Sequence, residues 1–296
     1  MRLWQRVGCL CWAIWIVGNP IYIVAAVNPD YGRTPVLFVH GHGLYPSDWR
    51  EIIAHLIGIG YPKEYLYAVE IVPNNMANVQ AAITVIAPAA ESLLKKAEIA
   101  ARVAGYQDKP PRQLDIVSHS MGAVSSRWYV AKLRPDRVRT WISLAGANHG
   151  TKALCPYPDD AAKEMCQVFA TTDRESAVQV ALNGTPKAPL DETPFGVGRD
   201  RAGINRVPPD DSRSITYFSM RIEPDAWIKP ERSAILDGAG GIPVEIPSGV
   251  PVVETSPGNY LFQGKEGLFQ KDVDHCSILI HSDLLRFVVA LLAVNR

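Results

Sequence analysis

The sequence of 296 residues has no excess of charge of either sign, because Lys and Arg together number 30 and so do Asp and Glu. Proteins that bind nucleic acid usually carry a basic surface, so this composition gives no indication of a nucleic-acid partner. Internal repeats, low-complexity tracts and runs of like charge are also absent, which disfavours solenoid, coiled-coil and disordered architectures. The remaining composition is that of an ordinary globular protein, long enough to bury one large core without metals or disulfides.

Cysteine is scarce. The five cysteines are Cys9, Cys11, Cys155, Cys166 and Cys276. Their spacing lacks the Cys/His pattern of a zinc site. Cys155 and Cys166 are close enough in the sequence for a local disulfide in a loop-rich segment, and two unpaired thiols are the alternative. We expect Cys276 to be a small buried hydrophobic residue.

Charged residues are missing from residues 7–29, a stretch that follows two arginines. Small side chains at residues 24–26 provide a cleavage site before Val27, so the pattern predicts a signal peptide over residues 1–26 and a secreted or periplasmic protein. A retained membrane anchor is the alternative, since the uncharged run approaches the length that spans a membrane. Gly, Asn and Pro at residues 18–20 would interrupt such a helix.

From Val27 onward, short apolar runs alternate with helical patterns, which favours an α/β fold with a mostly parallel sheet flanked by helices. We predict one domain over residues 27–296. The predicted strands are 35–39, 66–72, 114–118, 138–144, 214–220 and a short one at 252–253. The predicted helices are 47–57, capped by Ser47, then 77–104, 123–133 and 282–294.

The alternation of strands and helices stops over residues 151–211, a segment rich in Pro, Gly and Asp. At most two short helices are expected there, near residues 161–170 and 176–182. Because long loops in a compact domain are usually functional, we predict an irregular insertion that acts as a lid or cap. Its apolar side chains face either a lipid or the core, and they include Val168, Phe169, Val178 and Val180.

The most informative motif is Ser118-His119-Ser120-Met121-Gly122, which joins a buried-strand pattern to an amphipathic helix. At a sharp strand-to-helix turn, a serine hydroxyl is thrust out of the sheet. The backbone N–H groups that follow then point at an anion formed beside it. We therefore predict that Ser120 is a catalytic nucleophile.

A serine nucleophile needs a base to accept its proton, and the base needs a group that orients it. His275 is the predicted base because it lies on a loop between the last irregular stretch and the closing helix. His281 is the alternative, although its place at the start of that helix is explained by packing or capping.

The orienting carboxylate is expected just after the strand that follows the insertion. Asp225 has this position, and Glu223 and Asp274 are the alternatives. An Asp would hold the imidazole in one tautomer and stabilise the imidazolium that forms during attack. The resulting order of Ser, Asp and His along the chain is the one found in hydrolase sheets of this type.

A third motif, Val39-His40-Gly41-His42-Gly43, directly follows a buried strand. Its glycines allow a backbone N–H to turn toward a reacting carbonyl, so we predict an oxyanion hole formed by the main chain of His42 and Met121. The imidazoles of His40 and His42 alternate in direction and lack further ligands nearby, so no metal site is predicted.

Together these motifs resemble those of the α/β-hydrolase superfamily, and more narrowly the small secreted bacterial lipases and esterases that include the class 2 lipases. The resemblance runs from about Pro35 to the end of the chain. It is carried by residues 40–43, 118–122, 144–151, 225–230 and 236–239 and by the His275 loop. One departure is Ser118, which occupies the first glycine position of Gly-x-Ser-x-Gly.

The resemblance implies a serine enzyme that hydrolyses esters on a sheet of eight or fewer strands and needs no cofactor. The predicted partner is an ester or lipid substrate, with transient contact to a lipid interface, and the predicted reaction passes through an acyl-enzyme on Ser120. Short-chain esterase, long-chain lipase and polyhydroxyalkanoate depolymerase activities all remain open. A binding protein with a vestigial site is the alternative of a different class. His149 matches a pattern of the family and is expected to fix its loop.

Overall fold

The structure is a computed structural model that describes residues 27–107, 110–156, 159–166, 176–199, 207–208, 211–266 and 271–294. The predicted signal peptide, residues 1–26, lies outside the described residues. Val168 and Phe169, two of the apolar residues of the insertion, also lie outside them.

A seven-stranded sheet forms the centre of the molecule, in the order β2-β1-β3-β4-β7-β9-β8. Its strands are β1 (Val36–Val39), β2 (Leu66–Ala68), β3 (Leu114–His119), β4 (Val138–Leu144), β7 (Thr216–Ile222), β8 (Val252–Ser256) and β9 (Asn259–Phe262). All neighbours pair in parallel except β8, which runs antiparallel to β9 at one edge. The predicted fold class, a mostly parallel sheet flanked by helices, is therefore confirmed.

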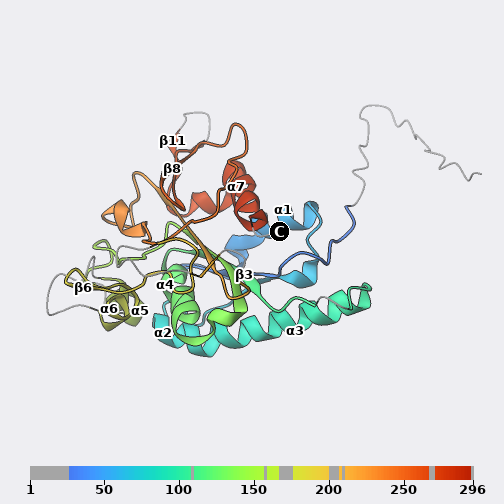
Figure 1. Ribbon diagram of the computed structural model, residues 1–296. Coiled ribbons are helices and arrows are strands. Elements are labelled where there is room, and N and C mark those ends of the chain that lie inside the picture. The colour runs from blue at the N-terminus through green and yellow to red at the C-terminus, as the bar shows by residue number, and fades with distance from the viewer. Residues whose placement is uncertain are drawn as a thin grey trace, which may run out of the picture.

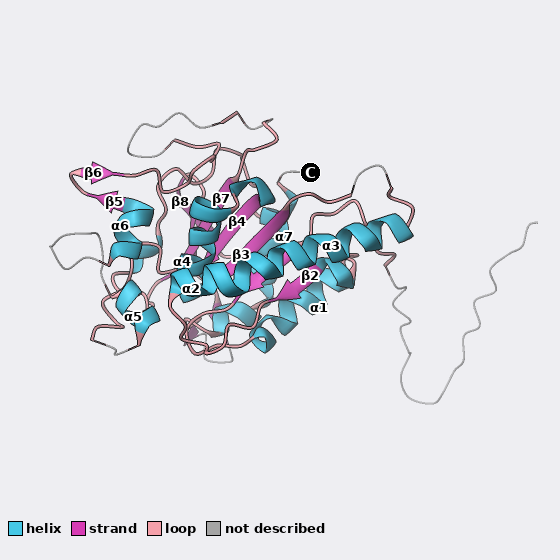
Figure 2. Cartoon of the chain, turned by 90° about the horizontal axis from the view of Figure 1, so that it is seen from below, coloured by secondary structure: helices cyan, strands magenta, loops and turns pink. Residues whose placement is uncertain are grey.

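Helices cover both faces of this sheet (Figures 1 and 2). The helices α2 (Asn78–Ala81), α3 (Ala87–Val103) and α4 (Met121–Trp128) lie on one face, and α1 (Arg50–Gly58) and α7 (Ser282–Ala293) lie on the other. One turn of π-helix, Ala82–Ile86, joins α2 to α3, and another, Tyr129–Leu133, extends α4. Three-residue and four-residue 3₁₀ segments occur at Pro46–Trp49, Lys63–Tyr65, Pro135–Arg137, Glu231–Ala234 and Ser277–Ile280.

Two apolar clusters, one on each face of the sheet, form the core. Along β1 the side chains alternate between them: Leu37 and Val39 join one cluster, whereas Val36 and Phe38 join the other. Because a strand covered on both faces is buried at every position, it reads as a continuous apolar run rather than an alternating one. This explains why the buried strands could be recognised from the sequence.

Three details of the predicted elements are wrong. Ser47 does not cap α1, because it lies inside the 3₁₀ helix Pro46–Trp49, which precedes α1 directly. The strand predicted over 66–72 ends at Ala68. The short strand predicted at 252–253 extends to Ser256 and forms a hairpin with β9, a strand that was not predicted.

The insertion contains two short helices, as predicted: α5 (Asp160–Met165) and α6 (Ala177–Asn183). They lie together at one end of the molecule (Figure 1). The small ladder β5 (Gly184–Thr185) with β6 (Ala188–Pro189) follows α6, and a second ladder, β10 (Lys265–Glu266) with β11 (Lys271–Asp272), lies elsewhere in the chain. Val178 is buried in the core rather than turned toward a ligand.

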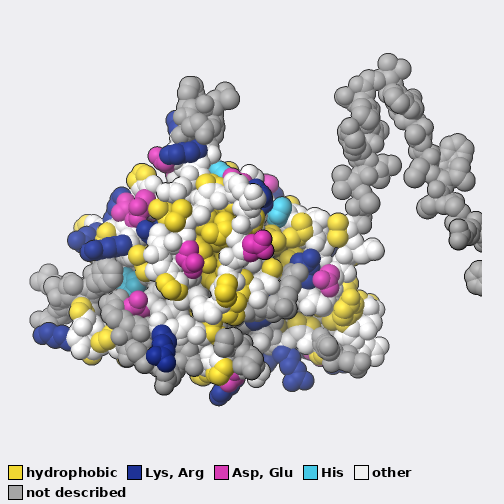
Figure 3. All heavy atoms as spheres, turned by 45° about the horizontal axis from the view of Figure 1, so that its top comes forward, with side chains coloured by type: hydrophobic (Ala, Val, Ile, Leu, Met, Phe, Trp, Pro, Cys, Tyr) yellow, Lys and Arg dark blue, Asp and Glu magenta, His cyan; other side chains and the backbone are white. Residues whose placement is uncertain are grey.

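Cys155 and Cys166 form a disulfide, which decides between the two alternatives left by the sequence. Cys276 is exposed, so its predicted burial is wrong. In the part of the chain that the structure describes, no helix is long and apolar enough to cross a membrane. On the face seen in Figure 3, positively and negatively charged side chains are interspersed with apolar ones.

Candidate active site

Four parallel strands, β1, β3, β4 and β7, end at the same edge of the sheet. In open α/β sheets, ligands bind in the crevice outside the carboxyl ends of the strands. The loops that carry the predicted site residues all leave from this edge: His42 follows β1, Ser120 follows β3 and Asp225 follows β7. The topology therefore gathers residues that are far apart in the sequence.

Ser120 is the residue between β3 and α4, and its backbone has φ 54° and ψ −121°. A positive φ is unfavourable for a residue with a Cβ, so the surrounding structure must hold this turn in place. The turn is held by the Ser120 N–H, which donates to the Leu144 carbonyl over 3.1 Å, and by the Ser120 carbonyl, which accepts the N–H of Ala123. Ser120 as a whole residue is 8% exposed at the carboxyl edge.

Gly122, the second residue after Ser120, lies so close to the backbone at the end of β1 that no side chain fits there. A Cβ on Gly122 would lie 2.4 Å from the carbonyl oxygen of Val39 and 2.5 Å from that of His40. Helix α4 therefore packs directly on the end of β1. Ser118, at the first glycine position of the Gly-x-Ser-x-Gly pattern, has room for its side chain, and its hydroxyl donates to the Ile142 carbonyl in the neighbouring strand over 2.9 Å.

His275 and Asp225 form a buried pair, in which Nδ1 of the imidazole lies 2.9 Å from Oδ2 of the carboxylate. The second carboxylate oxygen of Asp225 accepts the backbone N–H groups of Trp227 (2.7 Å) and Ile228 (3.0 Å). Both oxygens of Asp225 are thus used. This arrangement fixes the orientation of the carboxylate and favours the proton of His275 on Nδ1, leaving Nε2 free to accept a proton.

The three alternatives for these two positions are engaged elsewhere. His281 caps α7, where its Nδ1 accepts the N–H of Asp283. Glu223 forms an ion pair with Arg221 at 2.8 Å, and Asp274 accepts the N–H groups of its own turn, from Cys276 and Ser277.

Ser120 and His275 line one cavity of about 140 Å³, together with His42 and His119. The rest of its lining is mostly apolar and consists of Leu44, Ala147, Thr151, Leu154, Met165, Trp227, Ile228 and Cys276. Among the described residues, the Ser120 hydroxyl and His275 form no direct hydrogen bond. Catalytic hydrogen bonds are often long before substrate binds and tighten in the complex, so this geometry is compatible with proton transfer between the two.

The backbone around His42 packs closely against the Ser120 turn. A Cβ on Gly41 would lie 2.8 Å from Cβ of Ser120, so only glycine allows this approach. Met121 is the first residue of α4, and the first N–H groups of a helix have no acceptor within it. The two residues predicted to form the oxyanion hole thus come from backbone that lies beside Ser120: His42 follows Gly41 directly, and Met121 follows Ser120 at the start of α4.

The His42 side chain reaches across to the insertion, where its Nε2 lies 3.0 Å from Oδ2 of Asp159. The other oxygen of Asp159 caps α5 by accepting the N–H of Ala162. Burial raises the pKa of Asp159, but the hydrogen bonds from Ala162 and His42 outweigh burial and place the pKa below its ordinary value. The imidazole of His42 thus ties the predicted oxyanion loop to the start of α5.

His119 belongs to the site although it was not predicted to have a role. Its Nε2 donates to the main-chain carbonyl of His275 over 2.7 Å, and the two rings pack with centroids 4.7 Å apart. Complete burial, and then the nearby His275, lower the pKa of His119 well below its usual value, so the ring is neutral at physiological pH. The one available signal in the sequence was an imidazole directly before the proposed nucleophile.

His149 fixes its loop, in agreement with the expectation from the sequence. Its Nδ1 lies 3.2 Å from the Ser233 carbonyl and its Nε2 lies 2.9 Å from Glu192, and all three groups are buried. Burial raises the pKa of Glu192, but His149 and the buried Arg127 lower it more, so this carboxylate is charged. The network joins the loop after β4 to the insertion.

Metal ligands do not gather in the described part of the chain, where no group of three or more His, Cys, Asp or Glu side chains could hold an ion. The imidazole of His40 is used structurally: Nδ1 bonds the Gly41 carbonyl and Nε2 accepts the N–H of Ile71. Burial lowers the pKa of His40.

Comparison with known proteins identifies the family of this chain. The family model described as lipase (class 2) matches residues 33–183, just over half of the chain. The chain belongs to the class 2 lipase family. The match includes the β1 loop, the Ser120 turn and the disulfide, and ends at the last residue of α6. The central sheet and its flanking helices are those of an α/β-hydrolase.

Solved structures similar to this member of the class 2 lipase family include the mature lipase BlEst2 of Bacillus licheniformis, at 16% identity and a TM-score of 0.49, covering 94% of this chain and 98% of that one. The carboxylesterase CesB of Bacillus subtilis is similar at 13% identity and a TM-score of 0.42, and the match covers 90% of this chain and 86% of that one. The lipase B of Aspergillus fumigatus is similar at 15% identity and a TM-score of 0.45, and the match covers 80% of this chain and 52% of that one. A search of curated proteins found no significant match.

Proposed function

We propose that this class 2 lipase family member hydrolyses carboxylic esters through an acyl-enzyme formed on Ser120. The observation that carries the proposal is the buried pair of His275 and Asp225, 2.9 Å apart, on the same cavity as a serine held at a positive φ. A hydroxyl is a poor nucleophile unless a base removes its proton, and a base of fixed tautomer at this cavity meets that need. The apolar lining suits the acyl part of an ester.

In the proposed reaction, Nε2 of His275 accepts the proton of Ser120 as Oγ attacks the ester carbonyl. Asp225 keeps the Nδ1 proton in place and stabilises the imidazolium. His275 then gives its proton to the departing alcohol, which leaves an acyl group on Ser120. Water, deprotonated by the same imidazole, attacks the acyl carbonyl and releases the acid and free Ser120.

The negative oxygen that develops in both steps would accept the backbone N–H groups of His42 and Met121. Donors that are oriented before the reaction stabilise this charge without reorganisation, which is usually the largest contribution to catalysis of this kind. Met121 also begins α4, so the partial positive charge of the helix N-terminus acts on the same oxygen. The ties between His42 and α5 support this loop in the required position.

Replacement of Ser120 by Ala tests the assignment. We expect S120A to fold like the wild type and to lose at least about 10³-fold in kcat on p-nitrophenyl esters, since catalysis without the nucleophile rests on binding and the oxyanion hole alone. S126A is the control, because Ser126 is a buried serine of α4 that does not line the cavity and whose hydroxyl bonds to Ala123 and Trp141. Undiminished turnover by folded S120A would refute the assignment.

The same proposal includes export and a cap. Residues 1–26 would act as a signal peptide, and residues 151–211 would cover the active site of the hydrolase domain, 27–296. The disulfide supports an oxidising compartment, because disulfides persist mainly outside the cytosol. N-terminal sequencing of the protein recovered from a secreting host should begin at Val27; a chain that retains its first residues in the membrane fraction would indicate an anchor instead.

A further inference from the structure

Two of the apolar side chains that line the cavity lie directly next to the half-cystines. Leu154 precedes Cys155 and Met165 precedes Cys166, and both side chains are buried against the core. The disulfide holds the two cysteine Cα atoms 5.1 Å apart. It therefore fixes Leu154 and Met165 relative to each other on the cavity wall.

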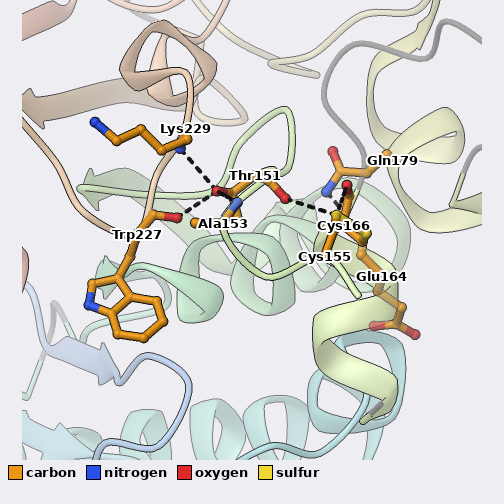
Figure 4. Close-up of a disulfide and its surroundings, with 8 residues drawn as sticks. All are labelled: Thr151, Ala153, Cys155, Glu164, Cys166, Gln179, Trp227 and Lys229. Atoms are coloured by element: carbon orange, nitrogen blue, oxygen red, sulfur yellow. Dashed lines mark hydrogen bonds between the residues drawn. A yellow bond between two sulfur atoms is a disulfide. The ribbon is translucent and has the colours of Figure 1, made fainter. Parts of the chain in front are cut away.

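A second set of bonds ties this wall to the loop after β7, and Figure 4 shows the bonds of Thr151 with Trp227 and Lys229 of that loop. The Thr151 N–H donates to the Met165 carbonyl over 2.6 Å, and the Thr151 hydroxyl donates to the Trp227 carbonyl over 2.5 Å. The same hydroxyl oxygen accepts the N–H of Lys229. Because Trp227 also lines the cavity, Thr151 joins two sides of the cavity wall.

Helix α5, which ends at Met165, is fixed to the hydrolase core from both ends. At its start Asp159 bonds His42, and near its end the Glu164 carboxylate accepts the backbone N–H and the side-chain amide of Asn78, at 2.5 and 2.8 Å. Asn78 is completely buried at the start of α2. The wall that carries Met165 is thus held by a disulfide, by Thr151 and by both ends of its helix.

The volume of the cavity limits the length of acyl chain that it can hold. The cavity has a volume of about 140 Å³. An apolar cavity of about 150 Å³ takes up a molecule of the size of benzene, with six carbons. An acyl chain of about four to six carbons bound beside Ser120 would therefore fill this cavity, and its apolar contacts there include Leu154 and Met165.

We infer that the enzyme is selective for short acyl esters, of about four to six acyl carbons, and that Leu154 and Met165 set this limit from the wall held by the disulfide. The inference rests on the proposed function, since it presupposes an acyl chain attached at Ser120. It identifies the substrate class as short-chain esters rather than long-chain lipids or polyesters with long side chains.

The test is the dependence of kcat/KM on acyl length for p-nitrophenyl esters from acetate to dodecanoate, below the concentrations at which they aggregate. Each enclosed methylene is worth about fourfold in kcat/KM. We expect kcat/KM of the wild type to rise to butanoate or hexanoate and to fall at least tenfold by dodecanoate. A maximum at decanoate or beyond would overturn the limit.

The variants L154A and M165A should each move the maximum to longer chains by two or more carbons and raise the ratio of dodecanoate to butanoate turnover at least tenfold. The matched control is L182A, which removes the same volume as L154A from a buried position in α6 that does not line the cavity. Its maximum should stay where the wild-type maximum is. Unchanged maxima in both L154A and M165A, or the same shift in L182A, would overturn the assignment of the wall.

The disulfide is tested with the double variant C155S/C166S, whose fold is checked by circular dichroism. A ratio of dodecanoate to butanoate turnover at least threefold above the wild-type ratio supports the role of the disulfide in holding the wall, and an unchanged ratio overturns that role.

Labelling of Ser120 by a small fluorophosphonate distinguishes failure of the length limit from failure of the proposed function. Labelled enzyme that prefers long chains overturns only the length limit, whereas unlabelled enzyme that hydrolyses no ester overturns the proposed function with it.

Discussion

Replacement of Asp225 by Asn would test the proposed proton relay with almost no change in shape. In the wild type, one oxygen of Asp225 accepts two backbone N–H groups, from Trp227 and Ile228, and the other faces Nδ1 of His275. An asparagine would keep its oxygen toward the two N–H donors, because an NH₂ group there would meet donors only. Its NH₂ group would then face His275.

A donor at that position reverses the tautomer of His275. Nδ1 must become the acceptor, so the proton moves to Nε2, the nitrogen that should accept the proton of Ser120. In serine enzymes with the same triad, this substitution lowers kcat by about 10⁴, and we expect a loss of about 10³ to 10⁴ here. Such a loss corresponds to about 4 to 5.5 kcal/mol of transition-state stabilisation, at 1.36 kcal/mol for each factor of ten.

The assay is hydrolysis of p-nitrophenyl butanoate under saturating substrate, with thermal unfolding measured on the same samples. The melting temperature of D225N should stay close to the wild-type value, because the two backbone bonds are kept. E223Q is the matched control, since Glu223 lies on the same loop but pairs with Arg221 at the surface, and its kcat should stay within about twofold. A folded D225N with kcat within tenfold of the wild type, or an equal loss in E223Q, would refute the reasoning.

Three further predictions follow from contacts around the site. G122A should lose about 1 to 3 kcal/mol of stability and most of its turnover, because the added methyl group would lie 2.4 Å from the Val39 carbonyl oxygen; equal melting temperatures would contradict this. S118G should lose about 1 kcal/mol with the hydrogen bond of its hydroxyl but keep kcat, and a large loss of kcat would show a role beyond packing. E192Q should cost about 1.5 to 3 kcal/mol at neutral pH, as measured by urea unfolding. Burial raises the pKa of Glu192, but the neighbouring His149 helps to lower it below the ordinary value of 4.5. The charged carboxylate therefore stabilises the fold above pH 4.5. This contribution is lost as the pH falls through the lower pKa of Glu192 in the folded state. The stability difference between E192Q and the wild type should therefore shrink in acid, and a difference that grows would contradict the sign.

The parts of the fold that could be predicted are those that leave a local pattern. Buried parallel strands such as β1 and β4 read as apolar runs, and the loops after them carry the glycines and polar residues that face a ligand. From these patterns Asp225 and His275, 50 residues apart, could be predicted as partners, and in the structure their side chains are hydrogen-bonded; their catalytic roles stay a prediction. The strand β9 left no comparable signal, because it begins with the polar residue Asn259 instead of forming a continuous apolar run and lies between two glycine-containing turns.

What could not be predicted are the side-chain pairs across the insertion. The bond from His42 to Asp159 spans 117 residues, and the bond from His149 to Glu192 spans 43, and neither follows from periodicity or from a turn motif. The exposure of Cys276 was missed for a related reason. Its neighbour His275 is bonded to Asp225 in the site, and Cys276, the residue that follows, lines the cavity and is exposed.

A fluorophosphonate probe, with localisation of the adduct by mass spectrometry, tests whether Ser120 is the activated nucleophile that the proposed function requires. Only a serine with a working base and oxyanion donors reacts with such a probe at low concentration. We expect one adduct on Ser120 in the wild type and none in S120A. An intact, folded wild type without an adduct, or one modified at another residue, would contradict it.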